Sequence, residues 1–414
     1  MMRLRKYHNM DNTWIIWVTA VSTYLVIYHH LGYPLLLRVL VRYFPPKLIP
    51  SPTRSYNNTE SDNQLSSMVV LMPAYNEAKW IADKIRNLSS LDYPSNKLRV
   101  ILACDGCTDN TAYIASETLR EVTCQHLKMT IIEYEENEGK VAVINKIMPS
   151  IGDDIVVMSD VSALISVDAL LIAATYFIDP LVGVVNGRYQ LLYPSKGEKK
   201  YWEYQSNLQY QEAQLGSTLG AHGALYLFRR SLFSPLEEDT INDDFVLPTK
   251  IVARGYRSSV DKAICAIELE PTNANQNFKR RLRIGAGNYQ QLLRLMNLLH
   301  PQHGGIAFTF ISGKALRVVM PFLMLTALLA WLWLAQYHIL FAVGAALQSV
   351  TYIVVTFFVV CNITPKNSLL ATLCYLVSSH TANMLGALRY IVGLEKGRWQ
   401  RVCLPTYNSI EKKR

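Results

Sequence analysis

The chain has 414 residues, half of them hydrophobic, and a formal net charge of +9. This length allows one soluble domain of about 200–250 residues together with further segments. The mean hydropathy of +0.11 and the concentration of apolar residues at both ends argue against a wholly soluble protein. The seven cysteines are scattered, which argues against a disulfide-stapled secreted domain.

The first predicted element is a membrane helix. Trp14–Leu37 is almost free of charge and is longer than the apolar core of a signal peptide. We therefore expect residues 1–44 to form an N-terminal transmembrane helix. Residues 45–66 are rich in Pro, Ser, Asn and Thr, and we expect a linker there.

From residue 67 onward, short apolar runs alternate with helical patterns. The expected strands are Ser67–Met72, ending at Pro73, then Leu98–Ala103, Met129–Glu133 and Asp154–Ser159, and the expected helices are Asn76–Leu88, Thr111–Leu119 and Gly139–Met148. This alternation predicts an α/β domain with a mostly parallel sheet, which we expect over residues 67–303. In such sheets, ligands bind beyond the carboxyl ends of the strands.

The C-terminal part contains further apolar segments. Val318–Cys361 runs for 44 residues without Lys, Arg, Asp or Glu, and therefore predicts two helices with a turn near Gln336–His338. Leu369–Leu388 predicts another. We expect about three transmembrane helices over residues 317–394 and a basic tail over residues 395–414.

Basic residues flank the predicted domain. Arg38, Arg42 and Lys47 follow the first apolar segment, and Lys314 and Arg317 precede the second. The positive-inside rule then predicts a multi-pass membrane protein whose domain is cytoplasmic. We expect no nucleic-acid partner. Basic residues at both chain ends also favour the cytoplasm: Arg3, Arg5, Lys6, Lys396, Arg398, Arg401 and Lys412–Arg414. Four membrane crossings, however, would leave both chain ends outside. The helix count and the orientation of the ends stay open.

Polar side chains follow the expected strands. The segment Pro73-Ala74-Tyr75-Asn76-Glu77 ends the first strand, where it can bind a base or ribose or begin a helix. Asp105 follows the second strand, and Gly106 permits a tight turn. Asp160 follows the fourth, where burial without a partner is costly. Mg²⁺ or Mn²⁺ between Asp160 and a diphosphate would satisfy it, while Ser162 is also a candidate helix cap.

Two further groups are candidates for chemistry. Asp243 and Asp244 are adjacent, so that one of them can act as a general base or the pair can cap a helix. Arg280, Arg281 and Arg283 are suited to a diphosphate leaving group or to anionic lipid headgroups.

Taken together, and in this order, these segments resemble family 2 glycosyltransferases, the membrane group that includes cellulose, hyaluronan and poly-N-acetylglucosamine synthases. The resemblance covers about Met68–Phe322. It implies a GT-A fold and an inverting transfer from a nucleotide sugar, in most members a UDP-sugar. The acceptor would be a glycan or a lipid, in cell-surface polysaccharide or glycolipid synthesis.

The resemblance also implies roles for individual residues. The nucleotide sugar would be bound by Pro73, Ala74, Tyr75, Glu77, Asp105, Lys140 and Asp160. Asp160 stands in the family's D-x-D metal motif, whose second position is Ser162 here, and would bind Mg²⁺ or Mn²⁺. Asp244 would be the base, with Asp243 beside it. The diphosphate and acceptor would contact Arg280, Arg281, Arg283, His222 and Gly223.

The sequence departs from the family pattern at the Q-x-x-R-W motif. Arg280 replaces Gln and Ile284 replaces Trp, which leaves long-chain polymerisation open. The segment Ile311–Lys314 resembles the family's entry into the membrane, so we expect an interfacial helix over residues 304–316. Membrane lipids, an oligomer or an export partner are expected partners. A non-catalytic membrane protein that binds nucleotides is the alternative, and a transporter would need charged groups inside several membrane helices.

Overall fold

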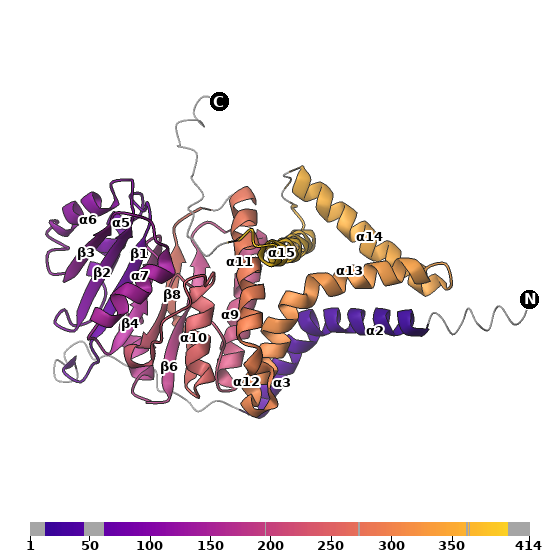
Figure 1. Ribbon diagram of the computed structural model, residues 1–414, viewed down its shortest axis with the longest axis horizontal. Coiled ribbons are helices and arrows are strands. Elements are labelled where there is room, and N and C mark those ends of the chain that lie inside the picture. The colour runs from indigo at the N-terminus through magenta and orange to yellow at the C-terminus, as the bar shows by residue number, and fades with distance from the viewer. Residues whose placement is uncertain are drawn as a thin grey trace, which may run out of the picture.

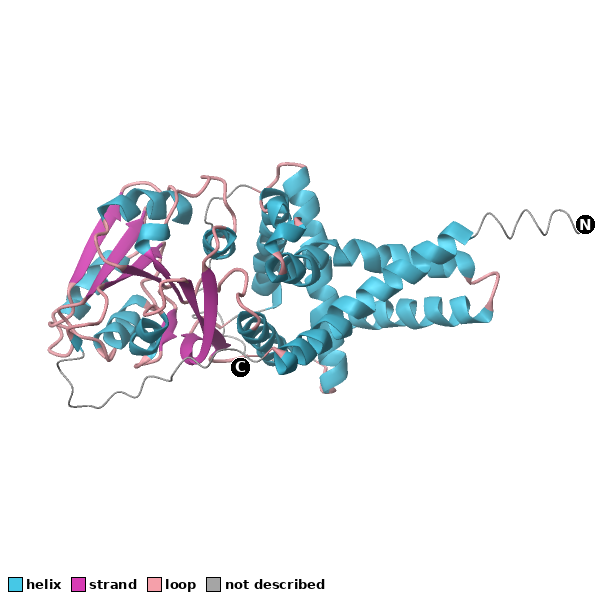
Figure 2. Cartoon of the chain, turned by 90° about the horizontal axis from the view of Figure 1, so that it is seen from below, coloured by secondary structure: helices cyan, strands magenta, loops and turns pink. Residues whose placement is uncertain are grey.

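The computed structural model describes residues 13–44, 62–194, 196–271, 274–361, 363 and 365–395, without the side chains of residues 196 and 274–277. A sheet with its covering helices lies at one end of the chain's structure, and long helices project from it at the other end (Figures 1 and 2). Most of the expected linker and basic tail lies outside the described residues, as do Arg3, Arg5, Lys6, Lys47, Lys396, Arg398, Arg401 and Lys412–Arg414.

The domain is built on an eight-stranded sheet of order β3-β2-β1-β4-β7-β6-β8-β5. Its strands are β1 (Met68–Ala74), β2 (Leu98–Asp105), β3 (Met129–Tyr134), β4 (Ile155–Met158), β5 (Ala163–Ile165), β6 (Val182–Leu191), β7 (Tyr226–Arg229) and β8 (Arg257–Glu268). Strands β1 to β4 pair in parallel, as do β6 and β8, whereas β7 and β5 are antiparallel to their neighbours. The predicted α/β class and mostly parallel sheet are confirmed.

The strand order reverses at β1, because the chain adds β2 and β3 on one side and then returns to place β4 on the other. Ligands bind beyond the strand ends at such a reversal. Strand β1 continues through Pro73 to Ala74, so the proline does not end it as expected.

Helices cover both faces of the sheet. They include α5 (Ile81–Ser89), α6 (Thr111–Leu119), α7 (Lys140–Ile147), α8 (Ala169–Tyr176) and α10 (Asp243–Ala253). Helix α5 begins five residues later than expected, because Asn76 adopts a left-handed conformation with φ of 57° and the chain turns before the helix.

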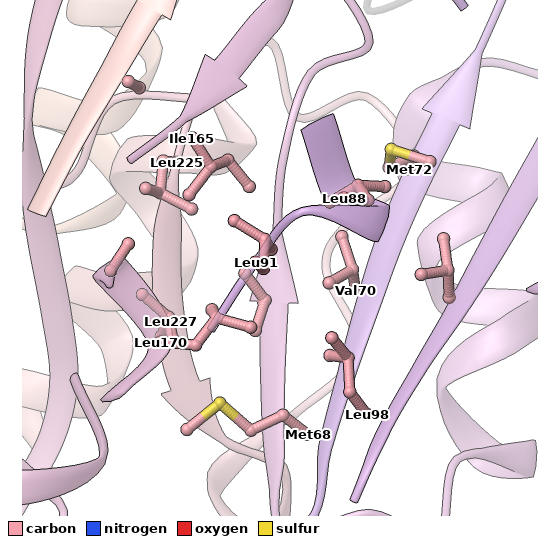
Figure 3. Packing of buried hydrophobic residues seen from close by; sticks show 14 of the residues in the cluster. Met68, Val70, Met72, Leu88, Leu91, Leu98, Ile165, Leu170, Leu225 and Leu227 are labelled. Atoms are coloured by element: carbon pink, nitrogen blue, oxygen red, sulfur yellow. The ribbon is translucent and has the colours of Figure 1, made fainter. Parts of the chain in front are cut away.

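Side chains of β1 alternate between two hydrophobic clusters, as strand geometry requires. Met68 and Val70 pack with Leu88 of α5 and Leu170 of α8 on one face (Figure 3). Val69 and Leu71 pack on the other face with apolar residues of α7 and α10. The buried sheet therefore gives the loops after its strands a rigid support.

The remaining long helices form the other part of the structure. They are α2 (Thr13–Ile27), which continues through a π-helical turn (Tyr28–Gly32) into α3 (Tyr33–Tyr43), and α9 (Lys196–Gln214), α11 (Ala274–Arg294), α12 (Gly305–Thr309), α13 (Leu316–Leu334), α14 (Ile339–Val360) and α15 (Ser368–Ile391). The expected turn near Gln336–His338 is confirmed between α13 and α14.

Among the described residues, three helical segments are long and apolar enough to cross a membrane: Thr13–Tyr43, Gly305–Leu334 and Ile339–Val360. Helix α12 and a π-helical turn (Phe310–Ala315) lead without a break into α13. The interfacial position expected for residues 304–316 stays a prediction.

Helix α15 forms where a fourth membrane helix was expected, but it is not among these three segments. It packs closely on α11 (Figure 1). A Cβ atom added at Gly386 of α15 would lie only 2.2 Å from the backbone oxygen of Leu282, so the glycine permits this approach. Several of its polar side chains, among them Ser379 and Asn383, face a cavity, which accounts for its lower hydropathy.

A buried polar cluster joins the helical part to the domain. Glu212 of α9 is fully buried and accepts hydrogen bonds from the hydroxyls of Tyr33 (2.8 Å) and Thr218 (3.0 Å). The Lys314 ammonium lies 3.8 Å from the same carboxylate. Segments far apart in the sequence are therefore held together at the domain surface.

Candidate active site

A cavity of about 630 Å³ lies between the carboxyl ends of the central strands and helices α9, α10, α11 and α15. Its walls also include residues of the first two candidate membrane segments. Nine predicted site residues line it: Lys140, Asp160, His222, Gly223, Asp243, Asp244, Arg280, Arg281 and Arg283. The other five are not among its lining residues: Pro73, Ala74, Tyr75, Glu77 and Asp105.

Three carboxylates converge around Lys140 at the start of α7. The Lys140 ammonium lies 3.2 Å from Oδ1 of Asp160 and 3.4 Å from Oδ2 of Asp243. The backbone N–H of Gly223 donates a 3.0 Å hydrogen bond to Oδ2 of Asp244. A Cβ atom at Gly223 would lie 3.3 Å from Oδ2 of Asp160 and 3.4 Å from Oδ2 of Asp244. The two carboxylates therefore flank this glycine.

The electrostatic environment keeps Asp160 and Lys140 charged. Burial by itself would raise the pKa of Asp160, but the attraction of Lys140 outweighs it and holds the pKa below its ordinary value. Burial would likewise lower the pKa of Lys140, and the carboxylates of Asp160, Asp243 and Asp244 instead raise it. Both groups therefore remain ionised at neutral pH.

Asp244 has the opposite tendency. Burial in the cavity raises its pKa to about 6, and repulsion by the neighbouring Asp243 adds to this effect. A carboxylate with a pKa close to neutral can accept a proton and release it again, which is what a general base must do. Asp244 lies in the first turn of α10, where the helix dipole stabilises its negative charge when the carboxylate is ionised.

Asp105 lies directly beneath the loop that leads to Lys140. It is fully buried, and its two oxygens accept hydrogen bonds from the backbone N–H groups of Glu138 (2.9 Å) and Gly139 (2.8 Å). Because both of its oxygens accept hydrogen bonds from this loop, Asp105 fixes the position of Lys140, which follows Gly139. Its contact with a nucleotide stays a prediction.

The loops after β1 and β2 are joined by hydrogen bonds. The side-chain oxygen of Asn76 accepts from the backbone N–H of Thr108 at 2.8 Å. The backbone N–H of Ala78 donates to Asp109 at 3.0 Å. Cys107 lies 3.4 Å from both the Asn76 nitrogen and the Ala74 oxygen, so its thiol belongs to this turn. The predicted nucleotide contacts of residues 73–77 remain predictions.

One carboxylate of this region was missed from the sequence. Glu268, at the end of β8, is buried, hydrogen-bonded to Ser162 and close to both Asp160 and Arg280. Burial raises the pKa of Glu268. Asp105 and Asp160 were found because they follow predicted strands. Glu268 also lies at a strand end, but β8 was not predicted, since its sequence does not clearly alternate between apolar and polar residues.

His222 was predicted from the sequence, but its aromatic partners Tyr189 and Trp202 were missed. The His222 ring stacks on Tyr189 with centroids 3.6 Å apart, and Trp202 meets both rings edge-on. Burial and the nearby Arg280 lower the pKa of His222 to about 3, so the imidazole is neutral. Its Nδ1 accepts from the Ala224 N–H at 3.2 Å.

Asp160 is the carboxylate expected to hold a divalent cation. No group of three or more His, Cys, Asp or Glu side chains arranged to hold a metal occurs in the part of the chain that the structure describes. Asp160 offers one carboxylate, and Lys140 already contacts its Oδ1. Mg²⁺ and Mn²⁺ are often held by a single carboxylate together with substrate phosphates and water.

Comparisons with known proteins find similar sequences and a similar fold. The family model "Glycosyltransferase like family 2" matches residues 66–287. Poly-beta-1,6-N-acetyl-D-glucosamine synthase from Staphylococcus aureus strain COL is 25% identical over 241 residues, which cover 56% of this chain and 57% of the relative. The synthase of the same name from Staphylococcus epidermidis has the same identity and coverage. The chain thus matches little more than half the length of these relatives.

Among solved structures, the mannosyltransferase PcManGT from Pyrobaculum calidifontis, in complex with GDP-Man and Mn²⁺, is similar along most of the chain. The TM-score is 0.68 and the sequence identity 23%, with 91% of this chain and 100% of that chain covered. At this identity the likeness concerns the fold.

Proposed function

The chain belongs to glycosyltransferase family 2, and on this premise we propose that it transfers a sugar from a nucleoside diphosphate donor to an acceptor hydroxyl, with Asp244 as the base. The observation that supports this most strongly is the convergence of Asp244, Asp160 and Lys140 on one cavity. Asp244 has the raised pKa that a base requires, while Asp160 and Lys140 stay charged.

The reaction is a single displacement with inversion. The acceptor oxygen attacks the anomeric carbon as its proton passes to Asp244, and the bond from that carbon to the diphosphate breaks. Lys140, Arg280 and Arg283 line the cavity and attract the negative charge that develops on the leaving group. The neutral His222 and Gly223 form the wall on which the acceptor lies.

Asp160 would hold a divalent cation, Mg²⁺ or Mn²⁺, with the donor diphosphate as its other main ligand. Such a cation, when bound, neutralises charge on the diphosphate. Asp160 itself contributes by orienting Lys140, 3.2 Å away.

The donor is proposed to be a UDP-sugar, as the resemblance implies, and the names of the curated relatives favour N-acetylglucosamine. The likeness to a structure bound to GDP-Man makes guanosine donors the natural comparison. The acceptor is proposed to be a glycan or lipid at a membrane.

The basic residues of the described segments support a cytoplasmic domain. Arg38 and Lys314 lie near the domain ends of the first two candidate membrane segments. Ile15 and Leu334 pack together, and α2 and α13 run side by side away from the domain (Figure 1). We therefore propose three crossings, with the N-terminal end outside and α15 on the domain side.

A donor screen with the purified full-length protein in detergent tests this function. UDP-N-acetylglucosamine, UDP-glucose and GDP-mannose are each incubated with and without Mn²⁺, and the released nucleoside diphosphate is measured. Metal-dependent release from one of them is expected. Absence of release and of glycosylated product with every donor, from protein that binds UDP, would contradict the proposal.

A further inference from the structure

The cavity extends beyond the carboxylates toward the candidate membrane helices. Its far end is lined by His29 and His30 of the first candidate segment, by Arg317 of the second, and by one side of α15, including His380. Helices α11, α13 and α15 contact one another (Figure 1). These residues have no part in the reaction described above.

Aromatic rings connect the two ends of the cavity. The stack of Tyr189 and His222 lies beside the carboxylates, and Trp202 is 4.7 Å from Tyr189 between ring centroids. Tyr201 follows at 5.3 Å from Trp202, and Tyr375 of α15 at 4.8 Å from Tyr201. All five rings line the cavity. Aromatic walls of this kind suit a ligand with an apolar ring face, such as a sugar.

Two guanidinium groups lie at the far end of this row. Arg281 lies 3.9 Å above the Tyr375 ring and donates only a long hydrogen bond of 3.4 Å to Ser378. Arg317 donates to the Gln205 side chain at 2.7 Å. Within the described ranges neither guanidinium forms an ion pair, whereas Lys314 has Glu212 at 3.8 Å. Glu198 is a buried carboxylate of the same cavity, but it forms no ion pair with either guanidinium among the described residues. A half-buried cation without an ion pair favours an anionic ligand.

The histidines beside Arg317 provide a second, independent observation. The rings of His29 and His30 are 5.0 Å apart, and those of His30 and His380 are 5.2 Å apart. His29 is held by the Ser312 oxygen at 3.0 Å. In contrast, Nε2 of His30 is buried without any hydrogen-bond partner among the residues the structure describes. A buried polar atom of this kind is costly unless a ligand satisfies it.

We propose that Arg281, Arg317, His30 and His380 form a phosphate site for a lipid-linked sugar acceptor. The phosphate binds at these four residues, the sugar lies along the aromatic rings, and the lipid chain continues among the candidate membrane helices. The reacting group is a sugar hydroxyl near Asp244, because a phosphate oxygen is already ionised and would need no base. Its proton passes to Asp244 as the new glycosidic bond forms and the donor diphosphate leaves.

A lipid phosphate is favoured over free phosphate because of where the site lies. Two of its walls come from candidate membrane segments, and the adjacent cavity residue Leu31 is 61% exposed. An uncharged glycan acceptor would add no negative charge beside the two guanidinium groups, neither of which forms an ion pair among the described residues. The inference rests on the proposed function, since it identifies the acceptor class of the same cavity.

Binding of model ligands to the full-length protein in a neutral detergent tests the inference. Dodecyl phosphate, dodecyl β-D-glucopyranoside and inorganic phosphate are titrated calorimetrically. Dodecyl phosphate is expected to bind at least about tenfold more tightly than the other two. Arg281→Gln and Arg317→Gln are each expected to weaken it by about ten- to a hundredfold, the effect of a lost charged hydrogen bond.

Arg38→Gln is the matched control, because Arg38 is an exposed arginine of α3 outside the cavity. It is expected to leave dodecyl phosphate binding unchanged, and Arg317→Lys should retain more affinity than Arg317→Gln. UDP binding measured in the same samples verifies that each variant is folded.

Several results would overturn the inference. One is that dodecyl phosphate binds no more tightly than dodecyl β-D-glucopyranoside or than inorganic phosphate. Another is that Arg38→Gln and Arg317→Gln weaken dodecyl phosphate binding equally. If the enzyme releases UDP with an uncharged acceptor while dodecyl phosphate does not bind, the inference fails and the proposed function stands. If no donor supports transfer, the proposed function fails and the inference fails with it.

Discussion

The ammonium group of Lys140 lies 3.2 Å from Oδ1 of Asp160, although the two residues belong to different loops of the sheet. Lys140 begins α7, and Asp160 follows β4. Their contact joins the loop that Asp105 holds by hydrogen bonds to the loop that contains Asp160 and Ser162. Ser162 stands where the family's metal motif has its second aspartate. This ion pair is the point at which donor diphosphate and acceptor base meet in the proposed reaction.

Replacing Lys140 should remove both the counter-charge of three carboxylates and a contact to the leaving group. Lys140→Met is expected to reduce kcat by about 10²–10³-fold, as for loss of one group that stabilises developing negative charge. Lys146→Met on the same helix is the control, because Lys146 pairs with the exposed Glu138 instead. Release of nucleoside diphosphate is the measurement, and equal rates in the two variants would refute this role.

Gly223 leaves little space between Asp160 and Asp244. In Gly223→Ala the added methyl would lie 3.3 and 3.4 Å from their oxygens, so at least one carboxylate must shift. Turnover is expected to fall by roughly ten- to a hundredfold through misplacement of the reacting groups. Gly152→Ala should have no effect, since nothing lies within 4 Å of its added Cβ. Steady-state kinetics of both variants would show whether the glycine matters.

Asp105 is predicted to act through the loop before α7. In Asp105→Asn one of the two backbone N–H groups loses its acceptor and faces an amide N–H₂. The variant should be destabilised by about 1–3 kcal/mol and should bind donor more weakly. Thermal unfolding and UDP titration measure the two effects, with the exposed Asp83→Asn as control. A fully stable Asp105→Asn protein would show that these bonds are dispensable.

The pH dependence should report the ionisation of Asp244. A base must be deprotonated to act, and the pKa of Asp244 is raised to about 6. The rate should therefore be constant above about pH 7 and fall with decreasing pH below about pH 6. Asp243→Asn removes the nearby negative charge and should move this fall to lower pH. A profile without an acidic limb would argue against Asp244 as the base.

Much of the fold could be predicted from the sequence because its signals are local. Strands β1 to β4 are short apolar runs bounded by polar loops, and the expected positions agree within about two residues. Strand β5 has three residues and β7 has four, too short to show an alternation. Helix α15 packs against α11, and this contact could not be predicted because the sequence of α15 alone does not reveal its neighbour.

The site was predicted in part for the same reason. Asp160 and Asp244 follow sequence patterns, and the structure brings them together at Gly223. Tyr189, Trp202 and Arg317 have no motif of their own, since they become neighbours only through the packing of helices distant in the sequence. The order of residues along the cavity is therefore information that only the three-dimensional structure contains.

The transfer rate of Asp244→Asn, measured beside its affinity for UDP, shows directly whether Asp244 is the base. Asparagine keeps the shape of the side chain and can still accept the hydrogen bond from Gly223, but it cannot take up a proton. Transfer is expected to fall by about 10²–10⁴-fold, with UDP affinity almost unchanged. Transfer at the wild-type rate in a variant that binds UDP normally would contradict this role.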